Sequence, residues 1–443
     1  MRSLVVVWGV ALTAVATLGG AGSAARGTAA KSFRPAADAH VTAAQKRKNF
    51  GRSRTLVAGG KARSVAYLRF DLRAVDATLG RTKLRLFART ASAARVTLRE
   101  AAPADWSERG VTFENRPSAG RIVASGRPRR GWLTFDVTSA ASRTYVLSLA
   151  LNAQSGRVAF ASREDRGHAP RLVVTAKPVA PQTLIAAGDI AGCDTNGDEQ
   201  TAALVAQIPG TVAALGDLVY ETGNALEFAN CYDPTWGKFK TRTRPAVGNH
   251  EYNTPGAGPY YNYFGAVAGE PGKGYYSYDL GRWHVVVLNS NCLNVSCEGG
   301  SAQEQWLRAD LGAHRSFCTL AYWHHPRFSS GPIGDDTMTD DLWSALYANG
   351  ADVILVAHDH EYERFAPQRP DQKPSPTRGI RQFVVGTGGR SHHAFTHVSA
   401  NSEVRDDTTF GVLKLELHAA RYAWQFVPVA GQSFTDSGTA LCH

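Results

Sequence analysis

The sequence lacks a Cys-x-x-Cys pair, has no second long apolar run after its first 25 residues, and contains no cysteine before residue 193. The first absence leaves a cysteine zinc site without support, and the second excludes a polytopic membrane protein. Hydrophobic residues make up 43% of the chain and charged residues 20%, which excludes a disordered chain or a collagen-like fibre. A length of 443 residues predicts about three domains.

The N-terminus has the pattern of an export signal. Arg2 precedes an apolar run from Leu4 to Leu18, and small residues follow at 21–25. The run is shorter than the ~20 residues that a membrane-spanning helix needs, so we expect a cleaved signal peptide over residues 1–25 rather than a membrane anchor. We then expect the mature protein to be secreted or extracellular, either free or associated with the cell wall. We expect no contact with the membrane after the signal is cleaved.

All six cysteines lie in the second half of the chain. An even number of cysteines in an exported protein predicts disulfide bonds. Six cysteines allow about 15 pairings, among which the sequence alone does not choose. Our expectation is the set Cys193–Cys231, Cys292–Cys297 and Cys318–Cys442.

Charge divides the chain into two parts. Residues 31–180 hold 29 lysines and arginines against 10 acidic residues, whereas residues 181–443 hold 18 against 28. Halves of opposite sign indicate two domains with different tasks. The basic half could bind an anionic polysaccharide or another cell-wall polymer, or it could simply present a solvated basic surface. We do not expect nucleic acid as a partner, because no motif for stacking bases is evident.

The first half predicts an all-β domain of jelly-roll type over residues 31–176. Its apolar residues alternate along short segments separated by Gly, Pro, Ser and Asn, without helical spacing. The expected strands are Val65–Phe70, Lys83–Phe87, Arg95–Arg99, Trp132–Phe135, Tyr145–Leu151, Val158–Phe160 and Arg171–Thr175.

Several segments of this half resemble the DNRLRE modules of secreted bacterial proteins. They are Asp38–Val41, Tyr67–Leu72, Lys83–Leu86, Trp106–Phe113, Asn115–Pro117, Phe135–Thr138 and Phe160–Glu164. The resemblance implies a carbohydrate-binding β-sandwich attached to an exported enzyme. A proline-containing linker over residues 177–182 then leads to a second domain over residues 183–443.

The second half repeats one arrangement five times: an apolar run ends at a polar residue that can bind a metal. Buried strands of an α/β domain have this pattern, and ligands of such domains lie beyond the carboxyl ends of the strands. Helical spacing predicts helices over Ala302–His314 and Thr339–Asn349. The five runs and their endings are Leu184–Gly188 before Asp189, Val212–Gly216 before Asp217, Arg244–Gly248 before Asn249-His250, Cys318–Trp323 before His324-His325, and Asp352–Ala357 before His358-Asp359-His360.

The residue types at these endings indicate the metal. Carboxylates, an amide oxygen and imidazoles suit iron, manganese or zinc, and no thiolate is required. Two metals would need a carboxylate that bridges them. Such a pair can hold a phosphate and activate a water for in-line displacement.

The order of these residues resembles that of the calcineurin-like metallophosphoesterases. Tyr220, in the segment Gly216-Asp-Leu-Val-Tyr220, resembles in particular the purple acid phosphatase branch, in which this tyrosine binds ferric iron. The resemblance implies two mixed β-sheets flanked by helices, with further strands at Trp283–Asn289, Gln382–Gly386, Val412–Leu417 and Tyr422–Val427. It also implies Fe³⁺ together with a divalent iron, zinc or manganese. The first metal would be held by Asp189, Asp217, Tyr220 and His360, and the second by Asp217, Asn249, His324 and His358.

Catalytic roles remain for two histidines beside these ligands. His324 is taken as the ligand because Pro326 follows it at the spacing of the family pattern, which leaves His325 to reach substrate or solvent. His250 is the best candidate for the acid that protonates the leaving group. The segments Tyr252–Tyr263 and Gly386–Arg390 are candidates for the walls of the cleft.

The resemblance leads us to expect a secreted phosphomonoesterase that uses a metal-bound hydroxide for in-line attack. The alternative is a phosphodiesterase acting on nucleotides, lipid headgroups or cell-wall polymers. A binding protein whose metal domain does not catalyse is the third hypothesis.

Overall fold

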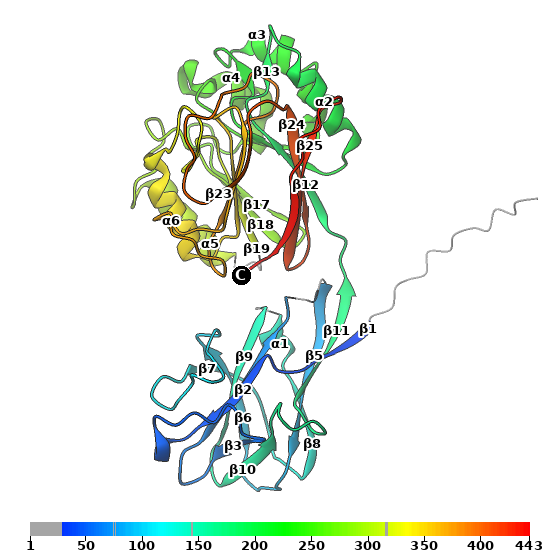
Figure 1. Ribbon diagram of the computed structural model, residues 1–443, viewed down its shortest axis with the longest axis vertical. Coiled ribbons are helices and arrows are strands. Elements are labelled where there is room, and N and C mark those ends of the chain that lie inside the picture. Colours follow the sequence, from blue (N-terminus) through cyan, green and yellow to red (C-terminus); the bar gives the residue numbers. More distant parts are fainter. Residues whose placement is uncertain (1–28, 74, 76, 143–144, 315–317) are drawn as a thin grey trace, which may run out of the picture.

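The structure is a computed structural model that describes residues 29–443, except 74, 76, 143–144 and 315–317. The signal peptide predicted over residues 1–25 lies outside the described residues. Two domains follow each other along the long axis of the molecule, and the chain passes from one to the other where β11 leads into β12 (Figure 1). Only residues 179–181 separate these two strands, so the predicted linker is shortened by strand pairing at both of its ends.

The N-terminal domain is a sandwich of two sheets in which all named strand pairs are antiparallel. One sheet has the order β1 (Ala29–Phe33), β11 (Arg171–Pro178), β5 (Ala77–Ala88), β10 (Arg157–Ala161) and β3 (Thr55–Gly59), with β8 (Gly131–Asp136) also paired to β5. The other has the order β2 (Ala37–Val41), β4 (Val65–Asp71), β9 (Val146–Ala153), β6 (Val96–Ala102) and β7 (Ser118–Gly126).

Alternation along the strands creates the core of this sandwich. On β5, Leu84 and Leu86 are fully buried, while Arg85 between them is exposed. Side chains alternate between the two faces of a strand, so this pattern places the leucines in the core and the arginine in solvent. The expectation of an all-β domain is confirmed.

Four strands of the sandwich, β1, β2, β3 and β7, were not among those expected from the sequence, and β7 and β3 show why. β7 is an edge strand whose residues 118–122 are all exposed, so it carries no buried stripe that a pattern could reveal. β3 has four consecutive buried residues and therefore does not alternate. Both strands are fixed by pairing with distant segments rather than by local pattern.

The C-terminal domain contains two mixed sheets, as expected. The six-stranded sheet has the order β16 (Thr243–Ala246), β14 (Thr211–Leu215), β12 (Gln182–Ala187), β24 (Gly411–Leu417), β25 (Arg421–Pro428) and β26 (Ser437–Leu441). The seven-stranded sheet has the order β17 (Tyr276–Leu280), β18 (Trp283–Val287), β19 (Cys318–Tyr322), β20 (Val353–Val356), β22 (Arg381–Val385), β21 (Tyr362–Phe365) and β23 (Ser402–Asp406). A small parallel pair joins β13 (Ala191–Gly192) to β15 (Val219–Tyr220).

The two large sheets bury one face against each other. Leu184 and Val212 of the first sheet belong to the same core as Val285 and Val353 of the second. The opposite face of the seven-stranded sheet is covered by α5 (Ala302–Ala313) and α6 (Asp340–Ala348) (Figure 1). These two helices correspond to the two predicted from the sequence. The remaining α-helices are α1 (Thr138–Ala141), α2 (Gly197–Gln207), α3 (Ala225–Glu227) and α4 (Gly258–Phe264).

The three expected disulfides are confirmed: Cys193–Cys231, Cys292–Cys297 and Cys318–Cys442. Within the described part of the chain, no helix is long and apolar enough to cross a membrane.

Candidate metal centre

The candidate ligands come together because parallel strands of both sheets end at the same edge of the domain. On the six-stranded sheet, β12, β14 and β16 run parallel and end just before Asp189, Asp217 and Asn249. On the seven-stranded sheet, β19 and β20 run parallel and end just before His324 and His358. The two sheets face each other, so both sets of side chains enter one space between them.

Four donor atoms form a first group. The Tyr220 hydroxyl donates a hydrogen bond of 2.7 Å to Asp189 Oδ1 and lies 3.3 Å from Asp217 Oδ2 and 3.1 Å from His360 Nε2. His360 Nε2 is in turn 3.5 Å from Asp189 Oδ1. These are the four residues that the sequence analysis assigned to the first metal.

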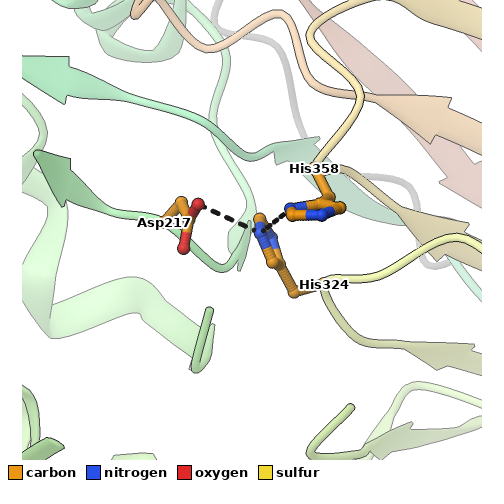
Figure 2. A group of neighbouring side chains, drawn as sticks. All are labelled: Asp217, His324 and His358. Atoms are coloured by element: carbon orange, nitrogen blue, oxygen red, sulfur yellow. Dashed lines mark hydrogen bonds and ion pairs between the residues drawn. The ribbon is translucent and has the colours of Figure 1, made fainter. Parts of the chain in front are cut away.

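A second group of four donors shares one atom with the first. His324 Nε2 lies 3.1 Å from each of Asp217 Oδ2, Asn249 Oδ1 and His358 Nδ1. Figure 2 shows the ring of His324 between the Asp217 carboxylate and the His358 ring. Asp217 Oδ2 is therefore common to both groups, as a bridging ligand must be.

Hydrogen bonds with a main-chain carbonyl and with a serine hydroxyl orient two of the imidazoles. His324 Nδ1 lies 2.9 Å from the Leu215 carbonyl, and His360 Nδ1 lies 2.7 Å from Ser391 Oγ. A partner at Nδ1 directs Nε2 of each ring toward the donor group. His358 differs, because its Nδ1 atom is the one that faces the group.

The backbone around the site is constrained. Asp189, Asp217 and His358 have φ values of 57°, 48° and 72°, in the left-handed region that residues other than glycine rarely adopt. Gly216 has φ +86°, and a Cβ atom there would lie 2.7 Å from His324 Nδ1. Strain of this kind is typical of functional sites. It follows here from turning the chain sharply at the end of each strand.

The electrostatics of the donors fit a cationic occupant. Burial, followed by the Asp189 and Asp217 carboxylates, raises the pKa of the Tyr220 phenol well above its ordinary value. Burial also opposes ionisation of Asp217, but the charge of His324 and a hydrogen bond from it hold the pKa of that carboxyl well below its usual range. Two buried carboxylates and a phenol this close can all be anionic only if cations compensate them. Oxygen and imidazole donors about 3 Å apart also match neighbouring ligands of a metal bound at about 2.1 Å.

The two candidate catalytic histidines border the same space. His250 Nε2 is 3.8 Å from Asp217 Oδ2, its Nδ1 is 2.6 Å from the Glu221 carbonyl, and its ring lies 4.3 Å from that of Tyr220. His325 packs its ring 4.4 Å from that of His358, and its Nδ1 lies 2.8 Å from Ser290 Oγ. Burial, together with the neighbouring His324 and His358, lowers the pKa of His325 well below its ordinary value, so this ring is neutral near pH 7.

One supporting residue was missed by the sequence analysis. Glu251 is fully buried and accepts backbone N–H groups of Gly248 at 2.7 Å, Leu218 at 2.8 Å and Asp217 at 3.1 Å. It thereby ties together the two loops that carry Asp217 and Asn249. The signal was available, since a carboxylate directly follows Asn249-His250 at the end of a buried strand, but only the fold shows its partners.

Both predicted wall segments reach the site. Tyr252 lines the cavity next to Asn249. Arg390 places its guanidinium 5.3 Å from the Tyr220 ring centroid and pairs with Glu221 and with Asp194, the latter at 2.7 Å. His393, beyond the second segment, stacks on His360 with ring centroids 4.0 Å apart.

Both domains match known families. Residues 180–362 match the family described as calcineurin-like phosphoesterase, and this range contains all seven candidate ligands. Residues 29–176 match carbohydrate-binding module family 96. The second match assigns these residues to family 96 and not specifically to the DNRLRE modules that the sequence motifs resemble. The expected all-β class is unchanged, and the description of family 96 also refers to carbohydrate binding.

Curated relatives include several plant phosphatases. Purple acid phosphatase 15 of Arabidopsis thaliana is 25% identical over 268 residues, covering 52% of this chain and 49% of the relative. Purple acid phosphatase 23 of the same plant is 27% identical over 231 residues, covering 44% and 50%. The chain thus spans about half the length of these relatives.

Among solved structures, purple acid phosphatase PPD1 from yellow lupin (Lupinus luteus) seeds has a TM-score of 0.49 and 16% identity, covering 87% of this chain and 73% of that one. In sequence, the second half of the chain is thus similar to calcineurin-like phosphoesterases, plant purple acid phosphatases among them, and the first half is similar to carbohydrate-binding module family 96.

Proposed function

We propose that this protein is a dinuclear-metal phosphoester hydrolase of the purple acid phosphatase type, acting on phosphomonoesters. The observation that carries the proposal is the sharing of Asp217 Oδ2 between two groups of donor atoms, of which only the first contains a tyrosine. A tyrosine, two carboxylates and an imidazole suit Fe³⁺, whereas the amide and two imidazoles of the second group suit a divalent iron, zinc or manganese. Such a metal pair, when bound, neutralises the phosphate and lowers the pKa of water.

The protein's own groups would complete the reaction. His250 lies at the edge of the donor groups with Nε2 toward Asp217, a position from which it can protonate a departing alkoxide. The contact of Nδ1 with the Glu221 carbonyl fixes the ring in that orientation. His325 is neutral and held by Ser290, so it can donate or accept a hydrogen bond at the substrate side of the second group.

The N-terminal module is proposed to hold the enzyme on an anionic polysaccharide of the cell wall. Trp132 on β8 is 41% exposed, and Arg85 places its guanidinium 4.9 Å from the Trp132 ring centroid. An exposed aromatic ring can pack on a sugar, and an adjacent arginine can pair with its carboxylate. The metal centre lies beyond the carboxyl end of β12, at the end of the catalytic domain that faces away from the module (Figure 1). Anchoring through the module therefore leaves the site open.

Location outside the cytoplasm is part of the same proposal. It is supported by the three disulfides, since such bonds persist in oxidising compartments.

The decisive experiment compares kcat/KM for an aromatic phosphomonoester and for its diester analogue on one metal-analysed preparation, from acidic to mildly alkaline pH. We expect a strong preference for the monoester, with two metals per chain. A preference for the diester would replace phosphatase by phosphodiesterase, whereas inactivity toward both with two metals bound would favour the non-catalytic binding protein.

A further inference from the structure

A cavity of about 520 Å³ opens directly beside the second group of donors. Asn249 and His358, two of the candidate ligands, form part of its wall, and His325 and Tyr252 lie next to them. A phosphate held at the donors would direct its ester substituent into this space. The lining of the cavity therefore bears on which alcohol the substrate carries.

Three large apolar side chains border the cavity although they are exposed to solvent. Leu293 is 92% exposed, Ile333 51% and Met338 45%. Single exposed apolar side chains are common on protein surfaces, whereas several that gather around one cavity indicate a ligand-binding site. They come from two segments far apart in the sequence, residues 292–294 and 333–338, which both line this cavity.

Both segments are held in place. The loop that carries Leu293 is closed by the Cys292–Cys297 disulfide, and the N–H groups of Asn294 and Val295 donate to the Asn291 carbonyl at 2.8 and 2.9 Å. In the second segment, the Met338 N–H donates to Asp336 Oδ1 at 2.9 Å. The apolar rim is thus preorganised and loses little conformational freedom when a ligand binds.

The charge of the cavity excludes a polyanionic substituent. Among the described residues that line it, none is a lysine or an arginine, whereas Asp335 and Asp336 both contribute. A second phosphate or a polyphosphate chain would meet carboxylates rather than cations here. An uncharged apolar group would cover the three exposed side chains instead.

We propose that this cavity selects phosphoesters whose alcohol is an uncharged aromatic or apolar group, with Leu293, Ile333 and Met338 as the specificity-determining residues. The inference rests on the proposed phosphoester hydrolysis and names the substrate class of that same site. Sugar phosphates and nucleoside polyphosphates are then poor substrates.

The test measures binding with phosphonates that cannot be hydrolysed. Calorimetry on the metal-loaded full chain compares benzylphosphonate with methylphosphonate, and inorganic phosphate reports on the metal centre alone. We expect benzylphosphonate to bind at least about tenfold more tightly than methylphosphonate. Leu293→Ser and Met338→Ser should each reduce that ratio about threefold or more, with phosphate affinity unchanged. Ile122→Ser, which removes a 54% exposed isoleucine in the distant β-sandwich, is the matched control and should change nothing.

The outcomes separate this inference from the proposed function. If phosphate binds but benzylphosphonate and methylphosphonate bind with equal affinity, the substrate class is overturned while the hydrolase proposal stands. The same holds if the two cavity variants leave the ratio of the two phosphonate affinities unchanged. If neither phosphate nor any phosphonate binds the loaded protein, the proposed function fails and the inference fails with it. Equal kcat/KM for 2-phenylethyl phosphate and glycerol phosphate, two alkyl esters, would also overturn the substrate class.

Discussion

The Nε2 atom of His324 lies 3.1 Å from the Oδ2 atom of Asp217, although the two residues follow strands of different sheets. β14 brings Asp217 from the six-stranded sheet and β19 brings His324 from the seven-stranded sheet. The contact exists only when the two sheets are packed face to face. Metal binding in this domain must therefore be linked to folding, because metals that bind the packed sheets stabilise them.

The first prediction concerns Tyr220. With iron bound, the protein should show a visible charge-transfer absorption from tyrosinate to Fe³⁺, and Tyr220→Phe should abolish it while leaving some metal bound. Absorption spectra and metal analysis check this. Tyr232→Phe is the control, because Tyr232 is fully buried and its hydroxyl has no hydrogen-bond partner in the part of the chain that the structure describes. If the protein is colourless but fully active with zinc or manganese, the assignment of iron is wrong and the proposed phosphoester hydrolysis still holds.

His250 is predicted to act on the leaving group. His250→Gln should lower kcat by roughly 10²–10⁴ for an alkyl phosphate, whose departing alkoxide needs a proton. The loss should be much smaller for an aryl phosphate, whose leaving group departs without one. Steady-state kinetics on a series of esters with different leaving-group pKa values check the difference. A loss that is independent of the leaving group would assign His250 to phosphate binding instead.

Glu251 is predicted to support the ligands without touching the substrate. Glu251→Gln places an amide donor against the N–H groups of Gly248 and Leu218, so we expect the free energy of unfolding to fall by about 1–3 kcal/mol. Metal affinity should fall about 10–100-fold. Chemical denaturation and metal titration measure the two effects. The control is Glu304→Gln, another buried glutamate, which accepts the Gly300 N–H at 3.1 Å near the start of α5 and should leave metal affinity unchanged.

A buried histidine far from the ligands predicts a pH dependence of stability. Burial alone would lower the pKa of His284, but hydrogen bonds with Asp310 at 2.6 Å and Asp279 at 3.0 Å outweigh it and raise that pKa above 6.5. The folded pKa exceeds the unfolded one, so the stabilisation is complete below about 6.5 and is lost as pH rises through the folded value.

Comparison of two proteins tests this dependence. The difference in free energy of unfolding between wild type and His284→Gln should be largest at mildly acidic pH and shrink at alkaline pH. His314 stacks on His284 with ring centroids 4.5 Å apart, so His314→Gln is measured in parallel as the control for loss of this neighbouring ring. A difference that does not change with pH would show that His284 is not charged in the folded protein.

Much of the fold followed from local pattern. Apolar runs such as Leu184–Gly188 and Asp352–Ala357 predicted buried strands because a strand covered on both faces needs few polar residues. The spacing in Ala302–His314 predicted α5 to within one residue at its C-terminal end. Segments without such a stripe, β7 and α2 among them, were missed. α2 is a helix with little apolar contrast between its faces, so only packing against the sheet fixes it.

The sequence by itself determined which polar residues end the strands, and hence the chemistry of the donors: two aspartates, a tyrosine, an asparagine and three histidines. It also supplied six cysteines whose pairing the structure then gave. Only the tertiary structure decided that Asp217 Oδ2 is shared, that His358 presents Nδ1, that Glu251 joins two loops, and that Leu293 and Met338 line one cavity. Residue type and strand periodicity are local properties of the chain. Distances between atoms that follow different strands are set by the packing of two sheets, which no local pattern contains.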